Sequence, residues 1–239
     1  MSSDGERRYH PQILSTGPDH RPGSRELIRR SAIAAEVQAI HAPQSPQVDA
    51  LRKIVARLLF WRSHRPPRLA VVSTDPGDGR TFMTANLAVL LAQAGKRVLL
   101  VDADLRGGRV HTLFGCDAAP GLSDLLPGDA DWRVVRAVEN VPGLHVLPGG
   151  SRRDTPLDFL TSTSFAEALD SLQPAFDMIL LDTPAQSAHM DAEVIAAQAG
   201  GALLVVYRDR TLLRQARHLA DSLTAAGVEV VGSVLNNGA

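Results

Sequence analysis

Five long apolar runs alternate with amphipathic segments, and this alternation is the feature that most constrains the fold. Most of the runs are too continuously apolar to face water, so strands formed from them would be buried on both faces. Strands of this kind that alternate with helices form a mostly parallel central sheet in an α/β three-layer fold, whose ligands bind at the carboxyl ends of the strands. The expected strands are residues 69–74, 97–103, 176–182, 201–207 and 228–235, and the expected helices are residues 81–95, 163–173, 188–199 and 211–226.

The first 45 residues differ in composition from the rest of the chain. They mix Ser, Pro, Gly, Arg and His with few large apolar side chains, which bury too little surface to offset the entropy of ordering. We therefore expect a flexible tail over residues 1–45 and a folded domain over residues 46–239. Within the tail, "SRELIRRSAIAAEVQAI" begins with a candidate N-cap, Ser24, and predicts a short helix from about residue 24 to residue 40. A second, amphipathic helix is expected from Val48 to about Arg62.

Composition and charge exclude several classes of protein. The chain has 239 residues, of which 44% are hydrophobic, so it can bury one substantial core. Its formal net charge of −1 argues against nucleic acid as a partner. The single cysteine, Cys116, cannot form an intramolecular disulfide, and no signal peptide or membrane-spanning apolar run is present. These features predict a cytoplasmic protein, and the spacing of the histidines predicts no zinc site.

A glycine-rich loop, "STDPGDGRT", follows the first expected strand. The backbone N–H groups from Gly77 to Thr81 can converge on phosphate oxygens, helped by the positive end of the following helix. Gly77 and Gly79 permit close approach, and the Thr81 hydroxyl is suited to Mg²⁺. Arg80 stands where the consensus G-x-x-x-x-G-K-[ST] has lysine. Taken alone, the loop is equally compatible with an ordinary strand-to-helix turn.

Two acidic loops follow other expected strands. In "DADLR", Asp102 and Asp104 would point to one side of an extended segment, where they could hold a hard cation or accept a hydroxyl proton. The alternative is a pair of solvated acids, one of them neutralised by Arg106. Asp182 ends the run "MILLD" in the Walker B arrangement. Because the three loops lie at strand ends of one parallel sheet, they predict a single nucleotide site in a P-loop NTPase-like fold.

These motifs together resemble a known family. The succession "STDPGDGRT", "NLAVLLAQAGKRVLLVDADLR", "GLSDLL", "LLDTP" and "GSVLN" is similar to the bacterial tyrosine kinases of capsule and exopolysaccharide synthesis. It is most similar to the branch encoded beside exopolysaccharide chain-length determinants, and the resemblance runs from about residue 45 to residue 237. The loops are shared with the wider deviant P-loop class, which includes chromosome-partitioning and cell-division ATPases, whereas "DADLR" and "GLSDLL" favour the kinase branch.

The resemblance implies ATP and Mg²⁺ as cofactors and assigns roles to individual residues. Arg80 would contact the β- and γ-phosphates, and Thr81, Asp104 and Asp182 would serve the metal. Asp102 would activate the tyrosine hydroxyl for in-line phosphoryl transfer, with Arg80 and Asp104 completing the catalytic set. Asn236 would read the adenine edge, although a strand-end asparagine without such a role is equally compatible. The residues expected to bind nucleotide are Pro76, Gly77, Asp78, Gly79, Arg80, Thr81 and Asn236.

The implied partners follow from the same family. We expect an autokinase-type enzyme that regulates exopolysaccharide chain length, polymerisation or export with a transmembrane co-polymerase, which would recruit it to the inner face of the plasma membrane. Self-association is expected, but the ring-forming pattern E-x-x-R-x-x-R is only partly kept, because Asp49 and Arg52 match and Val55 replaces the last arginine. The sequence contains two tyrosines, Tyr9 and Tyr207, which favours another protein as the tyrosine substrate.

Two other functions compete with this interpretation. Arginine is a planar fork rather than a compact ammonium, so Arg80 would permit nucleotide binding with slower transfer. This favours a nucleotide-gated interaction protein of the same pathway as the alternative. A partitioning-type ATPase is the third hypothesis, and it is disfavoured because Thr74 or Asp75 stands where that class carries a second lysine.

Overall fold

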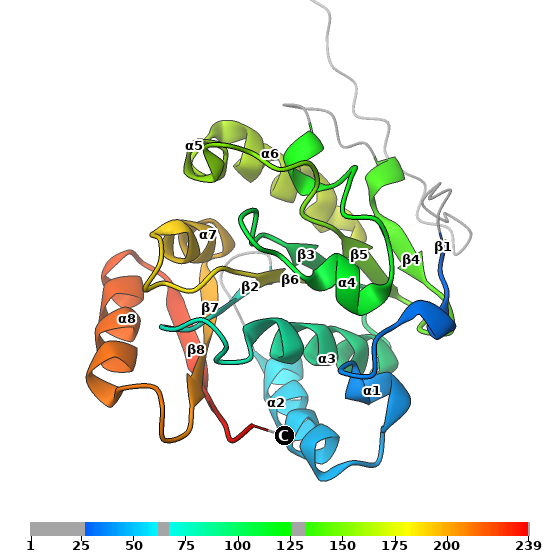
Figure 1. The fold of residues 1–239 in the computed structure, drawn as a ribbon, viewed down its shortest axis with the longest axis horizontal. Helices are drawn as coiled ribbons and strands as arrows, with labels where there is room; N and C mark the ends of the chain where they lie inside the picture. Colours follow the sequence, from blue (N-terminus) through cyan, green and yellow to red (C-terminus); the bar gives the residue numbers. More distant parts are fainter. Residues whose placement is uncertain (1–26, 62–66, 126–131, 239) are drawn as a thin grey trace, which may run out of the picture.

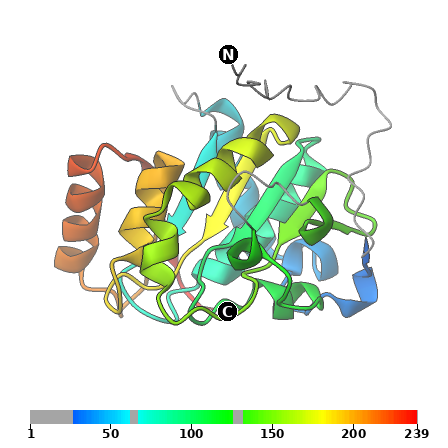
Figure 2. The same cartoon turned by 90° about the horizontal axis from the view of Figure 1, so that it is seen from above.

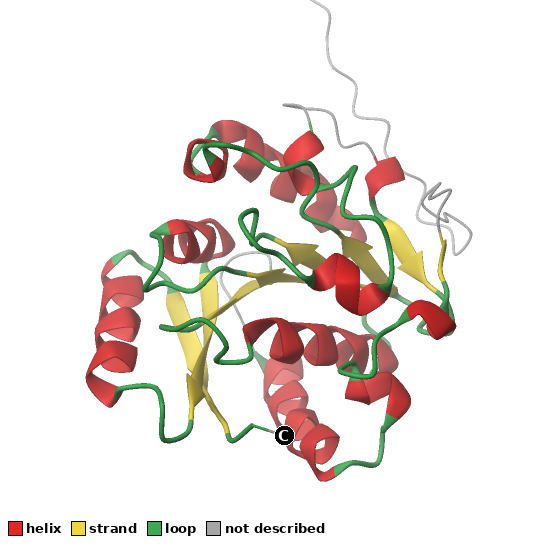
Figure 3. Ribbon diagram, in the orientation of Figure 1, coloured by secondary structure: helices red, strands yellow, loops and turns green. Residues whose placement is uncertain are grey.

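The computed structural model describes residues 27–61, 67–125 and 132–238. These residues form one eight-stranded sheet between two layers of helices (Figures 1 and 3). The strand order is β1-β4-β5-β3-β6-β2-β7-β8, and among the described pairings β4 with β5 is antiparallel while the others are parallel. The strands are β1 (Leu27–Ile28), β2 (Arg68–Val72), β3 (Val98–Asp102), β4 (Arg136–Val138), β5 (Leu144–Leu147), β6 (Met178–Asp182), β7 (Gly201–Tyr207) and β8 (Glu229–Asn236).

Helices cover both faces of this sheet. Helices α1 (Gln38–His41), α2 (Pro46–Phe60), α3 (Arg80–Gln93) and α4 (Val110–Phe114) bury their apolar residues in one core cluster. Helices α5 (Pro156–Leu160), α6 (Thr163–Leu172), α7 (Asp191–Ala199) and α8 (Leu213–Ala225) contribute to a second cluster on the opposite face. Figure 2, seen from the side of α5 and α6, shows these two helices in front of the strands. The α/β three-layer architecture with a mostly parallel sheet is therefore confirmed.

The five predicted strands are all present as β2, β3, β6, β7 and β8. The first four are buried almost throughout, because continuous apolar side chains face helices on both sides. The sheet edge formed by β8 is half-buried. The predicted helices correspond to α2, α3, α6, α7 and α8. The strands β1, β4 and β5 and the short helices α4 and α5 were not predicted, while α1 overlaps the end of the helix expected at about residues 24–40.

The single helix expected from about residue 24 to residue 40 was wrong for the part that the structure describes. Residues 27–28 form β1, which pairs in parallel with β4, and residues 30–32 form one 3-10 turn before α1 begins at Gln38. Tertiary contacts override the helical spacing, because Ile28, Ile33 and Val37 are buried against the domain. Asn86 of α3 fixes this segment by accepting a hydrogen bond from Ala39 N at 2.8 Å.

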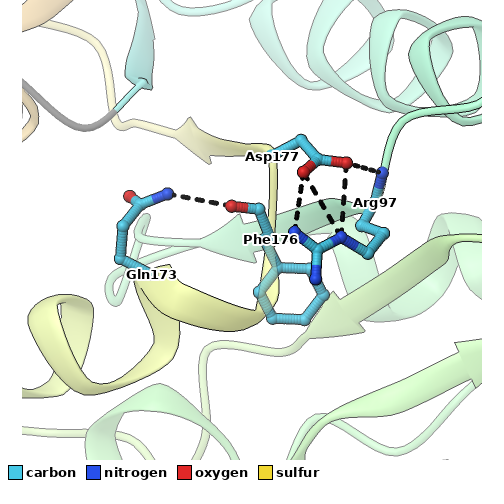
Figure 4. Close-up of polar contacts among 4 residues, drawn as sticks. All are labelled: Arg97, Gln173, Phe176 and Asp177. Atoms are coloured by element: carbon cyan, nitrogen blue, oxygen red, sulfur yellow. Dashed lines mark hydrogen bonds and ion pairs between the residues drawn. The ribbon is translucent and has the colours of Figure 1, made fainter. Parts of the chain in front are cut away.

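An ion pair fixes β3 and β6 at the end of the sheet opposite to the carboxyl ends of these strands. Arg97 precedes β3 and Asp177 precedes β6, and the Arg97 Nη2 to Asp177 Oδ1 distance is 2.7 Å (Figure 4). The Arg97 backbone N–H also donates to Asp177 Oδ2 at 2.8 Å. This pair holds the register in which Asp102 and Asp182 lie opposite each other at the far ends of the same two strands. In the described ranges, no helix is both long enough and apolar enough to cross a membrane.

Candidate active site

The glycine-rich loop lies between the end of β2 and the start of α3 at Arg80. Gly79, the N-cap of α3, has φ +96° and offers no capping side chain, so the N–H groups of the first turn point outward from the helix end. Gly77 also has a positive φ, +81°. The buried carboxylate of Asp78 accepts a hydrogen bond from Asp75 N at 3.1 Å and holds the loop closed. The loop therefore has the form of an anion-binding site.

The Arg80 guanidinium joins this loop to the end of β6. Its Nε donates to Thr183 O at 2.9 Å, and its Nη1 donates to Asp75 O at 2.9 Å and to Ser73 Oγ. Burial lowers the pKa of Arg80, and the carboxylates of Asp182 and Asp104 oppose this effect. Arginine stays charged at any physiological pH. Arg80 thus supplies a fixed positive charge between the loop and the acidic residues, and all three of these hydrogen bonds go to the chain itself.

Two buried carboxylates lie next to each other at the ends of β3 and β6. Asp102 and Asp182 are register partners, with exposures of 1% and 0%. Asp102 Oδ2 accepts from Val110 N at 3.0 Å. Asp182 Oδ1 accepts from the hydroxyl of Thr84 at 3.3 Å, and the interaction with the Thr81 side chain favours the charged form of the same carboxylate. Burial raises the pKa of Asp182 to about 6, and burial together with the Asp182 charge raises the pKa of Asp102.

Each of these carboxylates has one buried oxygen without a hydrogen-bond partner among the described residues, Asp102 Oδ1 and Asp182 Oδ2. Buried carboxylate oxygens without donors are costly unless a cation or water satisfies them. Hard oxygen ligands beside the hydroxyl of Thr81 fit Mg²⁺. Within the described ranges, no three His, Cys, Asp or Glu side chains cluster closely enough to hold a metal by themselves. Phosphate or water oxygens would therefore have to complete the coordination.

Asp104 holds the turn that follows β3. Its Oδ1 accepts from Gly107 N at 3.0 Å and from Arg106 N at 3.2 Å. The charge of Asp104 acts on Arg80, Asp102 and Asp182, which places it at the same site. Its neighbour Arg106 pairs with the buried Asp191 at the start of α7 at 2.7 Å. Asp191 was not singled out from the sequence, because an acid in the first turn of a helix has a sufficient local explanation.

A cavity of about 150 Å³ opens beside Asp102. Its polar lining residues are Asp102, Asp104, Arg106, His111, Ser151 and Arg152, and the rest of the lining is Leu105, Ala118, Gly107, Gly108, Gly149 and Gly150. A larger cavity of about 560 Å³ lies between the end of α2 and β8, and none of the predicted site residues lines it. Of these two cavities, the smaller is therefore the one that predicted site residues line.

The motif "GLSDLL" forms the support of this cavity. Asp124 Oδ2 accepts from Gly121 N at 2.8 Å and from Ser151 N at 2.9 Å, which holds the loop after β5 in place. Gly149 of that loop lies close to Asp102, and the Leu122 N–H donates to Pro148 O at 2.8 Å. The sequence did not predict β5 and so did not predict this wall of the site.

The side chains of Asn236 and Arg210, from the C-terminal half of the chain, also contact the glycine-rich loop. Asn236, at the end of β8, donates from Nδ2 to Asp78 O at 2.9 Å and lies against Gly79. It is thus beside the predicted nucleotide-binding residues, while its contact with adenine stays a prediction. Arg210, which follows β7, donates from Nη2 to Pro76 O at 2.8 Å. Arg210 was missed, because nothing local distinguishes it from other surface arginines.

Comparisons with known proteins agree with this geometry. A family model for the CobQ/CobB/MinD/ParA nucleotide binding domain matches residues 69–237. The tyrosine-kinase homologue EpsB of Ralstonia nicotianae is 39% identical over 199 residues, which are 83% of this chain and 26% of EpsB. Tyrosine-protein kinase YwqD of Bacillus subtilis is 32% identical over 209 residues, covering 87% of this chain and 88% of YwqD. The kinase domain of the Escherichia coli tyrosine kinase ETK has a TM-score of 0.76 at 27% identity, covering 84% of this chain and 79% of that structure. The chain spans about a quarter of the length of EpsB.

Proposed function

The chain belongs to the CobQ/CobB/MinD/ParA nucleotide-binding family and to the bacterial tyrosine kinases within it, and from this we propose that it transfers a phosphoryl group from Mg·ATP to protein tyrosine. The observation that carries the proposal is the pair of buried carboxylates, Asp102 and Asp182, between the glycine-rich loop and the 150 Å³ cavity. This arrangement offers one place for phosphates, one for a metal and one for an acceptor hydroxyl.

Each group of the site has a distinct task in this proposal. The N–H groups from Gly77 to Thr81 bind the phosphates, and Arg80 adds positive charge. Thr81 and Asp182 hold Mg²⁺, with Asp104 supporting it, and the ion supplies charge neutralisation at the phosphates. The carboxylate of Asp102, with its Oδ1 free of other partners in the described structure, accepts the proton of the tyrosine hydroxyl. The tyrosine oxygen then forms its bond to the γ-phosphorus as the bond to the bridging oxygen breaks, and ADP leaves.

The proposed setting is exopolysaccharide or capsule synthesis at the membrane. The matched region makes up 26% of EpsB but 88% of YwqD, so the same unit occurs within a longer protein and as nearly a whole protein. We assign the membrane-spanning part of this setting to a transmembrane co-polymerase. Regulation of chain length and recruitment to the inner face of the plasma membrane belong to the same proposal.

The test is transfer of label from γ-labelled Mg·ATP to tyrosine by the full chain, with and without the cytoplasmic segments of a co-polymerase. We expect Asp102→Asn to bind ATP and to lose labelling, because the amide cannot accept the proton. Asp170→Asn is the matched control, since Asp170 is an exposed carboxylate whose partner, Arg68, lies at the start of β2. Labelling that persists in Asp102→Asn would contradict the role of Asp102. Mapping the label distinguishes Tyr207, half-buried at the end of β7, from Tyr9, which lies outside the described residues.

One observation favours a second candidate, a nucleotide-gated interaction protein. Arg80 donates three hydrogen bonds to Ser73, Asp75 and Thr183, so its guanidinium is already engaged by the chain. A group that must leave such partners to follow the γ-phosphate would stabilise the transition state less than a free lysine. This candidate predicts ATP-dependent association with the co-polymerase segments and no phosphotyrosine. Nucleotide-independent association would exclude it.

A further inference from the structure

We propose that Arg210 is a second phosphate-binding cation of the nucleotide site, acting on the phosphate chain beside Arg80. The inference rests on the proposed nucleotide site and extends it to a residue that lies 130 positions beyond Arg80 in the sequence. Arg210 contacts the glycine-rich loop directly, through the 2.8 Å hydrogen bond from Nη2 to Pro76 O. It therefore belongs to the site by contact and not only by proximity.

The position of the guanidinium over Gly77 is the main evidence. A Cβ built on Gly77 would lie 3.2 Å from Arg210 Nη2 and 3.3 Å from Nη1, so the side of Gly77 that a side chain would fill is covered by both terminal nitrogens. Gly77 is also one of the two positive-φ residues whose N–H groups form the anion-binding loop. Within the loop "STDPGDGRT", Arg80 is the one residue with a positively charged side chain. A phosphate bound by the loop would therefore have a second positive charge, that of Arg210, next to it.

Arg210 has more N–H donors left for a ligand than Arg80 has. A guanidinium carries five N–H donors. Among the described contacts, the side chain of Arg210 donates one hydrogen bond, to Pro76, while the side chain of Arg80 donates three. Arg210 is exposed, so it can turn its remaining donors toward a ligand without breaking a buried contact. Guanidinium groups with free donors bind phosphate in a fork geometry.

The turn after β7 presents Arg210 in a defined place. Asp209 has φ +59°, and the Thr211 N–H donates to Tyr207 O at 3.0 Å, which closes the turn. The guanidinium lies 5.4 Å from the centroid of the Tyr207 ring, within reach of a cation–π interaction. The neighbouring Arg208 is instead 3.7 Å from Asp209 Oδ2. Of the two arginines in this turn, Arg210 is the one in contact with the glycine-rich loop.

The experiment compares nucleotide affinities of the full chain and three variants, measured with Mg²⁺ by isothermal titration calorimetry. Arg210→Gln should weaken ATP and ADP binding about tenfold, as expected for the loss of one charge-assisted hydrogen bond, and should leave adenosine binding unchanged. Arg210→Lys, which keeps the charge, should recover part of the loss. Arg208→Gln is the matched control in the same turn and should bind all three ligands within about twofold of the wild type, because an exposed ion pair contributes little.

Each result supports or overturns the proposal. Equal ATP affinity in Arg210→Gln and the wild type would overturn it, and so would an equal loss for ATP and adenosine, which would assign Arg210 to the base or to the shape of the loop. ATP binding that depends on Arg210 without tyrosine labelling would retain this inference and reject the proposed kinase. Normal tyrosine labelling by Arg210→Gln, together with unchanged ATP affinity, would reject this inference and retain the proposed kinase. A wild-type chain that binds no ATP would reject both.

Discussion

Replacing Gly108 with alanine should misplace Asp102 while leaving the nucleotide-binding loop intact. Gly108 has an ordinary φ, so the replacement adds no backbone strain. A Cβ at this position, however, would lie 2.5 Å from Asp102 Oδ2, 2.6 Å from Cγ and closer still to Oδ1. Its neighbour Gly107 has open space around the same position, so Gly107→Ala is a matched control one residue away.

The size of the effect follows from these distances. Real Cβ contacts are essentially never shorter than 3.0 Å, so either Asp102 or the turn must move, by at least about 0.5 Å at Oδ2 and more at Oδ1. Movement of the turn also disturbs Val110, whose N–H donates to Asp102 Oδ2. A displacement of about 0.5–1 Å of a catalytic group lowers a rate by roughly tenfold to a hundredfold. The expected loss in Gly108→Ala is in this range.

The assay is single-turnover phosphoryl transfer from γ-labelled ATP, combined with ATP affinity and thermal unfolding of both variants. We expect Gly108→Ala to lose phosphoryl transfer. Its ATP affinity should stay within about twofold of the wild type, because the interactions that bind ATP in the ground state are unchanged. Gly107→Ala should behave as the wild type in all three measurements. Equal transfer rates in the two variants would refute the reasoning. A parallel loss of ATP affinity in Gly108→Ala would also refute it, because the effect would then not be confined to Asp102.

Three further predictions concern stability and the support of the loop. Asp177→Asn should lower the free energy of unfolding by about 0.5–1 kcal/mol at pH 7, since the pair with Arg97 is partly exposed. Hydrogen bonding to Arg97 lowers the pKa of Asp177 in the folded state. The stabilisation is therefore fully present above the pKa of Asp in the unfolded chain, about 3.9, and is lost as the pH falls through the lower pKa of the folded state. Urea titrations that give the same difference at pH 7 and pH 3 would contradict this. Leu87→Ala, at a fully buried position of α3, should cost about 2–5 kcal/mol in urea unfolding, whereas Leu59→Ala, at 37% exposure on α2, should cost less than about 1 kcal/mol. Asn236→Ala should weaken ATP binding about fivefold through the loss of its hydrogen bond to Asp78 O, and the exposed Asn237→Ala serves as its calorimetric control.

The strands that could be predicted from the sequence are those whose signal is local. Four of the five, β2, β3, β6 and β7, contain a continuous apolar run, and burial on both faces produces that pattern regardless of which neighbours the strand has. By contrast, β1 and β4 have two and three residues, and they exist because they pair with each other and, for β4, with β5. Such short strands have no periodicity of their own, so sequence patterns cannot identify them.

The same distinction applies to the candidate site. Asp102 and Asp182 could be placed together because both end long strands of one parallel sheet. The wall formed by Gly149 and Ser151 depends on the pairing of β5 with β3 and on Asp124, which lies 27 residues before Ser151. Arg210 depends on a turn that brings it to Pro76, 134 residues away. Residues at the ends of predicted strands can be placed from the sequence. Contacts that depend on strand register and turn geometry can be identified only from the structure.

The glycines of the site illustrate why a motif can be identified correctly and still be explained incompletely. Gly77 and Gly79 have the positive φ values that a phosphate-binding loop requires, and this local reason is enough to identify the motif. Each of them also makes room for a side chain from the other half of the domain, Arg210 against Gly77 and Asn236 against Gly79. At Gly108 the local reason is missing, and close approach of the Asp102 carboxylate is what requires glycine there. The loop and the acidic pair are therefore fitted to charged and polar side chains of the chain itself, and a substitution at these glycines changes those contacts before it changes any contact with a phosphate.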